Sequence, residues 1–303
     1  MVEYKYNNSD KDLVKIINKD IYKLYLVSFV ANLQFFGAIT IPFFTEFAQL
    51  NYKSIFALES IYAIFLFIAD LPTGIFADRF SRKFSLTLGL VFLSLGYITF
   101  GISSNFGFFI LAELFCAFGA AFLSGVDKAL LFELLKKQNL EKDAMKYFAR
   151  LQSWGTLGIA FSLPLGSFLA KSYIFAPYPQ SLSYTFLLSA VIIIITSAIT
   201  MTINEENTKY LKTTFTKIAI ESYYQIRTNK KLLFLTLASA AVNAPIFFIM
   251  WLYQPLLLKV NLEVQYLGFV SCAFNLLGFL FLRFIVNIES FFGIKNLFFI
   301  SGF

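Results

Sequence analysis

The chain has 303 residues, of which 58% are hydrophobic and only 14% are charged, against about 25% in soluble domains. So few polar residues cannot coat a water-facing surface, which excludes a soluble globular enzyme and a disordered chain. The sequence contains no histidine, so it cannot build a histidine-based catalytic triad or a His-ligated zinc site. Cys116 and Cys272 lie in apolar runs and form no metal-binding motif. We therefore expect no enzymatic activity, no cofactor and no bound metal.

Nine apolar runs divide the chain, and each of the first eight is long enough to cross about 30 Å of hydrocarbon as a helix. The runs cover approximately residues 24–48, 55–77, 84–103, 106–134, 150–171, 182–203, 232–258, 264–286 and 291–303. The ninth run, of about 13 residues, is too short to cross unaided. The pattern predicts an all-α integral membrane bundle with eight complete transmembrane helices and part of a ninth.

Lysine and arginine alternate sharply between the two sides of these runs. The N-terminal segment and the second, fourth, sixth and eighth connections carry most of them, whereas the other connections hold only Lys53, Lys171 and Lys259. The positive-inside rule places the basic side, and with it the N-terminus, in the cytoplasm. We expect a multi-pass protein of the cell membrane. Its net charge of +7 then sets topology and contacts anionic lipid head groups, and does not indicate nucleic-acid binding.

The longest polar stretch, residues 204–231, separates the first six runs from the rest. Apolar residues recur there at helical spacing, which predicts a cytoplasmic amphipathic helix; a flexible tether is the alternative. A similar pattern before the first run predicts a short interfacial helix. We expect a six-helix bundle over residues 1–203, a linker over 204–231 and an incomplete second bundle over 232–303.

An acid among three bases joins the second and third runs at a membrane face. This segment, called here the Gly74–Lys83 motif, contains Gly74, Asp78, Arg79, Arg82 and Lys83. Gly74 would allow two helices to approach closely. Asp78 would form ion pairs when the two bundles meet, and its carboxylate would be solvated by water when the bundles separate. The alternative is a positive-inside turn with a local ion pair.

The motif resembles the signature between the second and third helices of the major facilitator superfamily, Gly-x-x-x-Asp-Arg-x-Gly-Arg-Lys, with Ser81 in place of the second glycine. The resemblance implies alternating access of two bundles, with these residues acting as a conformational gate on the cytoplasmic side. The family fold has twelve helices, so this chain lacks the last three. We expect a fragment of a longer protein; a truncated gene product is the alternative.

Acidic residues within the apolar runs are candidates for proton or ion coupling, because acids in hydrocarbon are costly. Glu113 and Asp127 are joined by steps of four and three residues through Ala117, Ala120 and Ser124, which would place them on one helix face. Asp70 shares a face with Glu59, about two turns from the cytoplasmic end. We predict coupling roles for Asp70, Glu113 and Asp127.

Structural alternatives exist for each of these acids. Asp70 could instead form a fixed ion pair with Arg82 or Lys128. Asp127 and Glu133 could pair with lysines at the cytoplasmic end.

Two further segments resemble a bacterial drug-efflux-like branch of the family. The stretch from Ser124 to Glu133 is similar to the end of its fourth helix, although Glu113 stands where that branch has arginine. Gly158 and Gly166 match the outer glycines of the antiporter motif in the fifth helix; close helix packing is the alternative reason for them.

Polar side chains near the middle of several runs would line a solute path. They are Asn32, Gln34, Asn243, Trp251 and Asn275. We expect a monomeric secondary transporter that moves a small solute by alternating access, with proton-coupled or ion-coupled efflux of an amphipathic compound. The alternatives are nutrient uptake and a truncated, non-transporting membrane protein.

Overall fold

The computed structural model describes residues 8–172, 174–205, 224 and 227–293, and these residues form helices and connecting turns with no strand among them. The long helices are α1 (Asn8–Ala31), α3 (Tyr52–Arg79), α4 (Arg82–Ile102), α5 (Phe106–Leu123), α6 (Val126–Lys137), α7 (Ala144–Lys171), α8 (Ser181–Met201), α10 (Lys230–Lys259) and α11 (Val264–Phe292). Seven helical stretches in the described residues are long and apolar enough to span a membrane. The predicted all-α membrane bundle is confirmed.

The first apolar run is not one helix, and this break is why one fewer continuous span is found than the sequence predicted. Helix α1 ends at Ala31, and the chain continues through three short helical pieces, η1 (Gly37–Ile39), α2 (Thr40–Pro42) and η2 (Phe43–Phe47). The Asn32 side chain donates to the carbonyl of Ser28 over 2.8 Å, four residues back. The same bond occurs at Asn243 and Asn275 within the continuous helices α10 (Lys230–Lys259) and α11 (Val264–Phe292), so it accompanies the break and does not cause it.

The fourth apolar run is also divided, at Gly125. This glycine has a φ of 69°, a left-handed conformation that a residue with a Cβ rarely adopts. Helix α5 therefore ends at Leu123 and α6 begins at Val126. The prediction that Glu113 and Asp127 share one continuous helix face is wrong, because the turn separates them.

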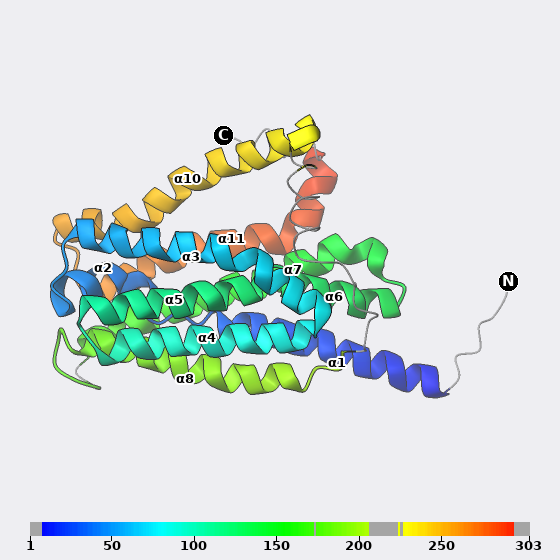
Figure 1. Ribbon diagram of the computed structural model, residues 1–303, viewed down its shortest axis with the longest axis horizontal. Coiled ribbons are helices and arrows are strands. Elements are labelled where there is room, and N and C mark those ends of the chain that lie inside the picture. Colours follow the sequence, from blue (N-terminus) through cyan, green and yellow to red (C-terminus); the bar gives the residue numbers. More distant parts are fainter. Residues whose placement is uncertain (1–7, 173, 206–223, 225–226, 294–303) are drawn as a thin grey trace.

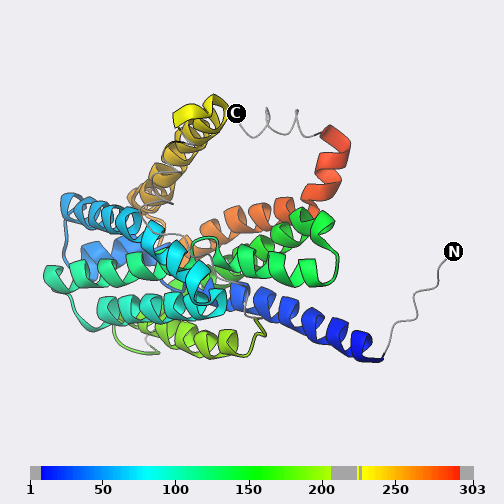
Figure 2. The ribbon, with the colours of Figure 1, turned by 45° about the vertical axis from the view of Figure 1, so that its right-hand side comes forward.

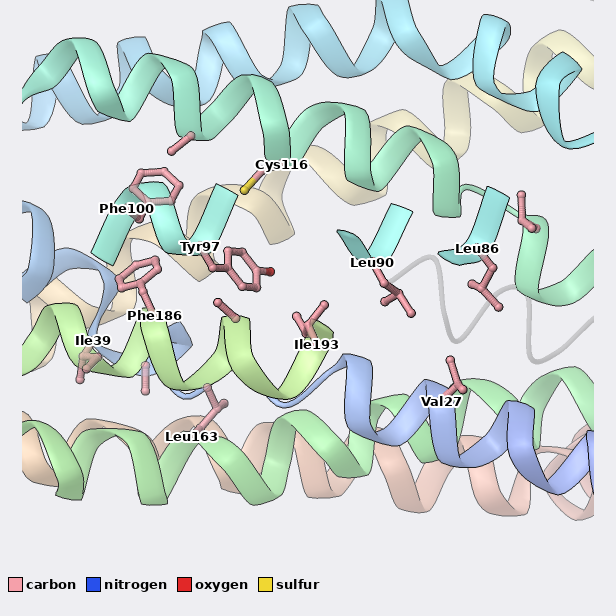
Figure 3. Close-up of a cluster of buried hydrophobic side chains, with 14 of the residues drawn as sticks. Val27, Ile39, Leu86, Leu90, Tyr97, Phe100, Cys116, Leu163, Phe186 and Ile193 are labelled. Atoms are coloured by element: carbon pink, nitrogen blue, oxygen red, sulfur yellow. The ribbon is translucent and has the colours of Figure 1, made fainter. Parts of the chain in front are cut away.

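The core between α4, α5 and α8 is built from aromatic rings. The centre of the Phe186 ring lies 4.4 Å from the centre of the Phe43 ring and 5.4 Å from the centre of the Phe100 ring. Figure 3 shows Tyr97, Phe100 and Phe186 gathered at one end of this core, with Cys116 beside them. Large apolar rings packed in this way fix the spacing of the helices around the cavity described below.

Close contact of α7 with α1 and with the segment that follows α1 depends on glycine. A methyl group at Gly158 would overlap the backbone oxygen of Phe29, and one at Gly166 would overlap that of Phe35. These two glycines therefore serve close helix packing. Gly74 has nothing within 4 Å of the position its Cβ would take, so the close approach expected there is absent from the described residues.

Helix α10 contacts the rest of the bundle only toward its C-terminal end. Residues 230–250 are almost entirely exposed, whereas Gln254 is buried. Both ribbon views show the N-terminal end of α10 slanting away from the bundle, while α11 packs along α7 (Figures 1 and 2). The amphipathic helix expected in the linker and the end of the ninth run lie outside the described residues.

Candidate functional site

A cavity of about 340 Å³ lies where α3, α4, α5, α8 and α10 converge with the broken segment after α1. This volume is within the range of small-molecule pockets, roughly 300–1,000 Å³. Aromatic residues are the largest group in its walls, beside several polar ones, and the lining includes Gln34, Phe36, Thr40, Phe44, Glu59, Tyr62, Tyr97, Phe100, Glu113, Cys116, Phe186, Trp251 and Gln254. We call it the Glu113 cavity.

Glu113 is the most deeply placed charged group of this cavity. Its side chain is only 5% exposed, and in the described part of the chain no hydrogen bond or ion pair holds its carboxyl. Glu59 enters the same cavity from α3, close enough for the two carboxyls to repel each other when both are ionised. The sequence predicts that Glu59 shares a helix face with Asp70 but gives no reason to assign Glu59 a coupling role. The packing of α3 against α5 brings Glu59 and Glu113 to the same cavity.

The opposite wall comes from α10 and the segment that follows α1. The Gln254 amide accepts a hydrogen bond from the backbone nitrogen of Ile41 and donates to the carbonyl of Gly37, both over 3.0 Å. The Trp251 ring lies 6.1 Å from that of Phe56 on α3. Of the predicted path residues, Gln34 and Trp251 thus line the Glu113 cavity, and Gln254 was missed.

A larger cleft of about 1,370 Å³ adjoins this cavity between α3, α5 and α10. Glu59 and Tyr62 line both spaces, and the cleft extends along α3 to Asp70. Asp70 is exposed there, and neither Arg82 nor Lys128 forms the ion pair considered for it.

The remaining predicted residues lie apart from the Glu113 cavity. Asn32 and Asp127 line a separate space of about 170 Å³ between α1, α4 and α6. Asn243 and Asn275 donate to carbonyls four residues back, over 2.8 and 2.9 Å, and line none of these three spaces. The predicted path is therefore brought together only in part.

The Gly74–Lys83 motif forms a compact ion-pair cluster in which Arg82 is central. Its guanidinium lies 2.6 Å from the Glu133 carboxylate and 3.4 Å from that of Asp78, and it also donates to the Ala129 carbonyl over 3.2 Å. The alternative for Glu133 considered only lysines, whereas the turn between α3 and α4 also brings Arg82 against α6. One cation thus links three helices.

Glu205, at the start of the linker, caps the N-terminus of α4. Its carboxylate accepts from the backbone nitrogens of Arg82 over 2.7 Å and Lys83 over 3.1 Å, and from the Ser81 hydroxyl. A carboxylate is favoured at a helix N-terminus, where backbone N–H groups lack helical partners. In the sequence, Glu205 is only an acidic residue just after the sixth apolar run, and nothing there indicates a contact with α4. The sequence therefore did not predict this role for Glu205.

The opposite end of the bundle is tied by the connection between α7 and α8. The Tyr178 hydroxyl donates to Glu46, and the Lys171 ammonium lies 3.7 Å from the centre of the Tyr178 ring. Burial and the hydrogen bond to Glu46 raise the pKa of Tyr178 above its ordinary value. This contact joins the segment after α1 to the end of α7.

Comparison with known proteins places the chain in a family. The model of the Major Facilitator Superfamily matches residues 24–303. A search of curated protein sequences found no match, whereas 36 chains of solved structures match.

The crystal structure of the nucleoside transporter NupG is one of these. It aligns with a TM-score of 0.69 and 16% identity over 91% of this chain and 69% of that one. A mutant of the same protein gives a TM-score of 0.72 and 16% identity over 91% and 70% of the two chains. At this identity the likeness shows the fold alone. Together with the family match over nearly the whole chain, it means that the chain belongs to the major facilitator superfamily of membrane transporters.

Proposed function

We propose that this protein is a secondary active transporter that moves a small solute through the Glu113 cavity by alternating access, and that it performs ion-coupled efflux of an amphipathic compound. The observation that carries the proposal is the composition of the cavity: aromatic side chains line it together with the carboxyl-bearing residues Glu59 and Glu113. Transporter sites are typically formed between two helical bundles near the membrane midplane. The Glu113 cavity has walls from helices on both sides of the linker.

Alternating access requires the two sides of the cavity to separate. Contacts between α10 and the segment after α1 are concentrated around Trp251 and Gln254, whereas the adjoining cleft continues along α3 toward Asp70 and the Gly74–Lys83 motif. This arrangement suits a path open toward the motif end. The Arg82 cluster then serves as the gate that closes that end, with Gly74, Asp78, Arg79 and Lys83 in the same segment.

Ion coupling follows from the cost of burying charge. An ionised carboxyl in an apolar site is unfavourable unless a partner neutralises it. Glu113 and Glu59 can release a proton when a solute binds and take up a proton when the solute leaves. The movement of protons and the movement of the solute then depend on each other. Asp70 and Asp127 lie in the neighbouring spaces and remain candidates for the proton route.

The membrane orientation is part of the proposal. The basic connections place the N-terminus and the Gly74–Lys83 motif on the cytoplasmic face of the cell membrane. We also propose that the protein acts as a monomer.

Uptake of a nutrient is the second candidate function. Structures of a protein described as a nucleoside transporter share this fold, and an aromatic cavity with the Gln34 amide in its wall suits stacking on a planar base. This alternative predicts that a nucleoside moves into the cell and that this movement does not depend on a cationic solute.

Transport by the full-length protein in sealed vesicles tests the proposal. With the vesicle interior acidified, we expect ethidium to accumulate, a proton ionophore to abolish accumulation, and Asp70→Asn and Glu113→Gln to weaken it. Protein-free vesicles are the control. An absence of movement that depends on the pH gradient contradicts ion-coupled efflux, and entry of labelled uridine instead supports uptake.

A further inference from the structure

A tyrosine hydroxyl on α1 is buried without a partner. The Tyr25 side chain is only 7% exposed, and its hydroxyl oxygen has no hydrogen-bond partner among the described residues. Native structures rarely leave a buried polar group in this condition, and each exception calls for an explanation. A ligand that accepts a hydrogen bond from the hydroxyl would supply one.

The charges near this hydroxyl are positive. Arg150 on α7 and Arg283 on α11 lie close enough to Tyr25 for their charges to act on its hydroxyl. Within the described residues neither arginine forms an ion pair. Asp20, the acid that precedes Tyr25 on α1, is paired with Lys23 at 2.8 Å. Two guanidinium groups and a hydroxyl that lacks an acceptor together favour binding of an anion.

The fold brings the three side chains to one end of the bundle. Helix α7 packs against both α1 and α11 (Figure 2). Tyr25 and Arg150 stand at the start of the first and fifth apolar runs, and Arg283 stands near the end of the eighth, so all three belong to the side of the basic connections. The head groups of membrane lipids lie at this depth, at the border of the hydrocarbon.

Exposed apolar side chains beside the site favour a lipid over a free anion. Phe281 and Phe284 flank Arg283 along α11, and Leu26 follows Tyr25 on α1; each of these three apolar side chains is about half exposed. Acyl chains would cover such a surface. A free phosphate would use the cationic groups alone and would leave the apolar surface uncovered.

We propose that Tyr25, Arg150 and Arg283 bind the phosphoryl group of an anionic lipid. The Tyr25 hydroxyl donates to one phosphoryl oxygen, and the two guanidinium groups pair with the others. Arg283 is exposed, so its side chain can turn toward the lipid and admit the phosphoryl group to the hydroxyl. Helix α11 follows the linker whereas α1 and α7 precede it, so the bound lipid holds the two bundles together at this end.

Lipid titration of the full-length protein in dodecyl maltoside tests the site, with bound lipid counted by native mass spectrometry. The probes are dioleoylphosphatidylglycerol, which has a net negative charge, and dioleoylphosphatidylcholine, which has the same chains and no net charge. We expect saturable binding of phosphatidylglycerol at least about tenfold tighter than that of phosphatidylcholine, because each arginine adds about fivefold to the affinity for a negative lipid. An excess of inorganic phosphate should not displace phosphatidylglycerol.

Four variants decide where the lipid binds. Arg150→Gln and Arg283→Gln should each weaken phosphatidylglycerol binding by about fivefold and leave phosphatidylcholine binding unchanged. Tyr25→Phe should also weaken it, and should raise the melting temperature of the lipid-free protein, because it removes a buried hydroxyl without a partner. Lys136→Gln removes an exposed cation at the end of α6, not among the charges that act on Tyr25, and should bind like the wild type.

Four results overturn the inference. They are equal affinity for the two lipids, including no binding of either; phosphatidylglycerol binding that survives all three substitutions at the site; an equal loss in Lys136→Gln; and displacement by inorganic phosphate, which would assign the site to a free anion. Arg283 is exposed, so Arg283→Gln keeps the test decisive if a variant of a buried residue fails to fold. These measurements involve no transport, so their outcome is independent of the proposed function.

Discussion

The guanidinium of Arg82 on α4 lies 2.6 Å from the carboxylate of Glu133 on α6, although the two residues are separated by an entire transmembrane hairpin. The same guanidinium reaches Asp78 at the end of α3. Both carboxylates and the arginine are partly accessible to water, so each ion pair contributes modestly, about 1 kcal/mol or less. Their importance lies in joining three helix ends that must move together if the motif is a gate.

Substitution of this pair should change transport more than stability. Glu133→Gln removes one partner of Arg82, and we expect a severalfold lower initial transport rate, because about 1 kcal/mol corresponds to a fivefold shift between two gate states. Arg82→Gln should have at least the same effect. Initial rates in sealed vesicles measure both. The double variant should be no slower than Arg82→Gln, whereas fully additive losses would show that the two residues act separately.

Glu205 should stabilise the protein through the N-terminus of α4. Glu205→Ala removes the acceptor for two backbone N–H groups, and loss of such a cap costs about 1 kcal/mol, so the melting temperature should fall by a few degrees. Glu205→Gln keeps one acceptor oxygen and should lose less. Melting followed by tryptophan fluorescence in detergent gives the values. An unchanged melting temperature in Glu205→Ala would contradict the capping role.

Gly158 and Gly166 of α7 should not tolerate a side chain. Gly166→Ala places a methyl group against the backbone oxygen of Phe35, which cannot move without shifting the segment after α1, so we expect a loss of about 1–3 kcal/mol or failure to fold. Gly278→Ala on α11 is the matched control, because its nearest neighbour, Thr156, lies at 3.6 Å and alanine is the better helix former. Yield and melting temperature of the two variants should differ; equal behaviour would contradict the observed packing.

Tyr178 should make stability depend on alkaline pH. Its pKa is raised in the folded state, so the stabilisation is complete below the unfolded value near 10 and is lost as pH rises through the folded pKa. The melting temperature of the wild type should therefore fall more steeply above pH 10 than that of Tyr178→Phe. Lysines titrate in the same range in both proteins, so the difference between the two curves isolates Tyr178. Parallel curves would mean that the contact with Glu46 contributes nothing.

The sequence predicted the helices well because hydrocarbon requires long apolar runs, and it predicted a turn between the second and third runs because charged residues separate them there. It missed the breaks after Ala31 and at Gly125. Asn32 and Gln34 at the first point and Gly125 at the second were visible as polar or small residues, but the sequence does not distinguish them from the asparagines and glycines that lie inside continuous helices; at Gly125 the break depends on a left-handed backbone conformation.

The candidate site was harder to predict than the helices. Glu113 and Trp251 were selected because acids and amphipathic rings stand out within apolar runs. Glu59 and Gln254 acquire their roles only through tertiary contacts, and the bonds from Gln254 to Gly37 and Ile41 join residues more than 200 positions apart. Periodicity along one helix carries no information about such partners.

The most direct measurement for the central claim, that the solute passes through the space beside Glu59 and Glu113, is the accessibility of a cysteine in the cleft. Ala63 lines that cleft, and Ala63→Cys is introduced with Cys116→Ser and Cys272→Ser to remove the native thiols. Membrane-impermeant thiol reagents are applied to sealed vesicles of both orientations, with and without the cation ethidium. We predict labelling from the motif side that the cation slows, and labelling from the opposite side only during turnover. Labelling that the cation leaves unchanged, or that is equal from both sides at rest, would contradict the account.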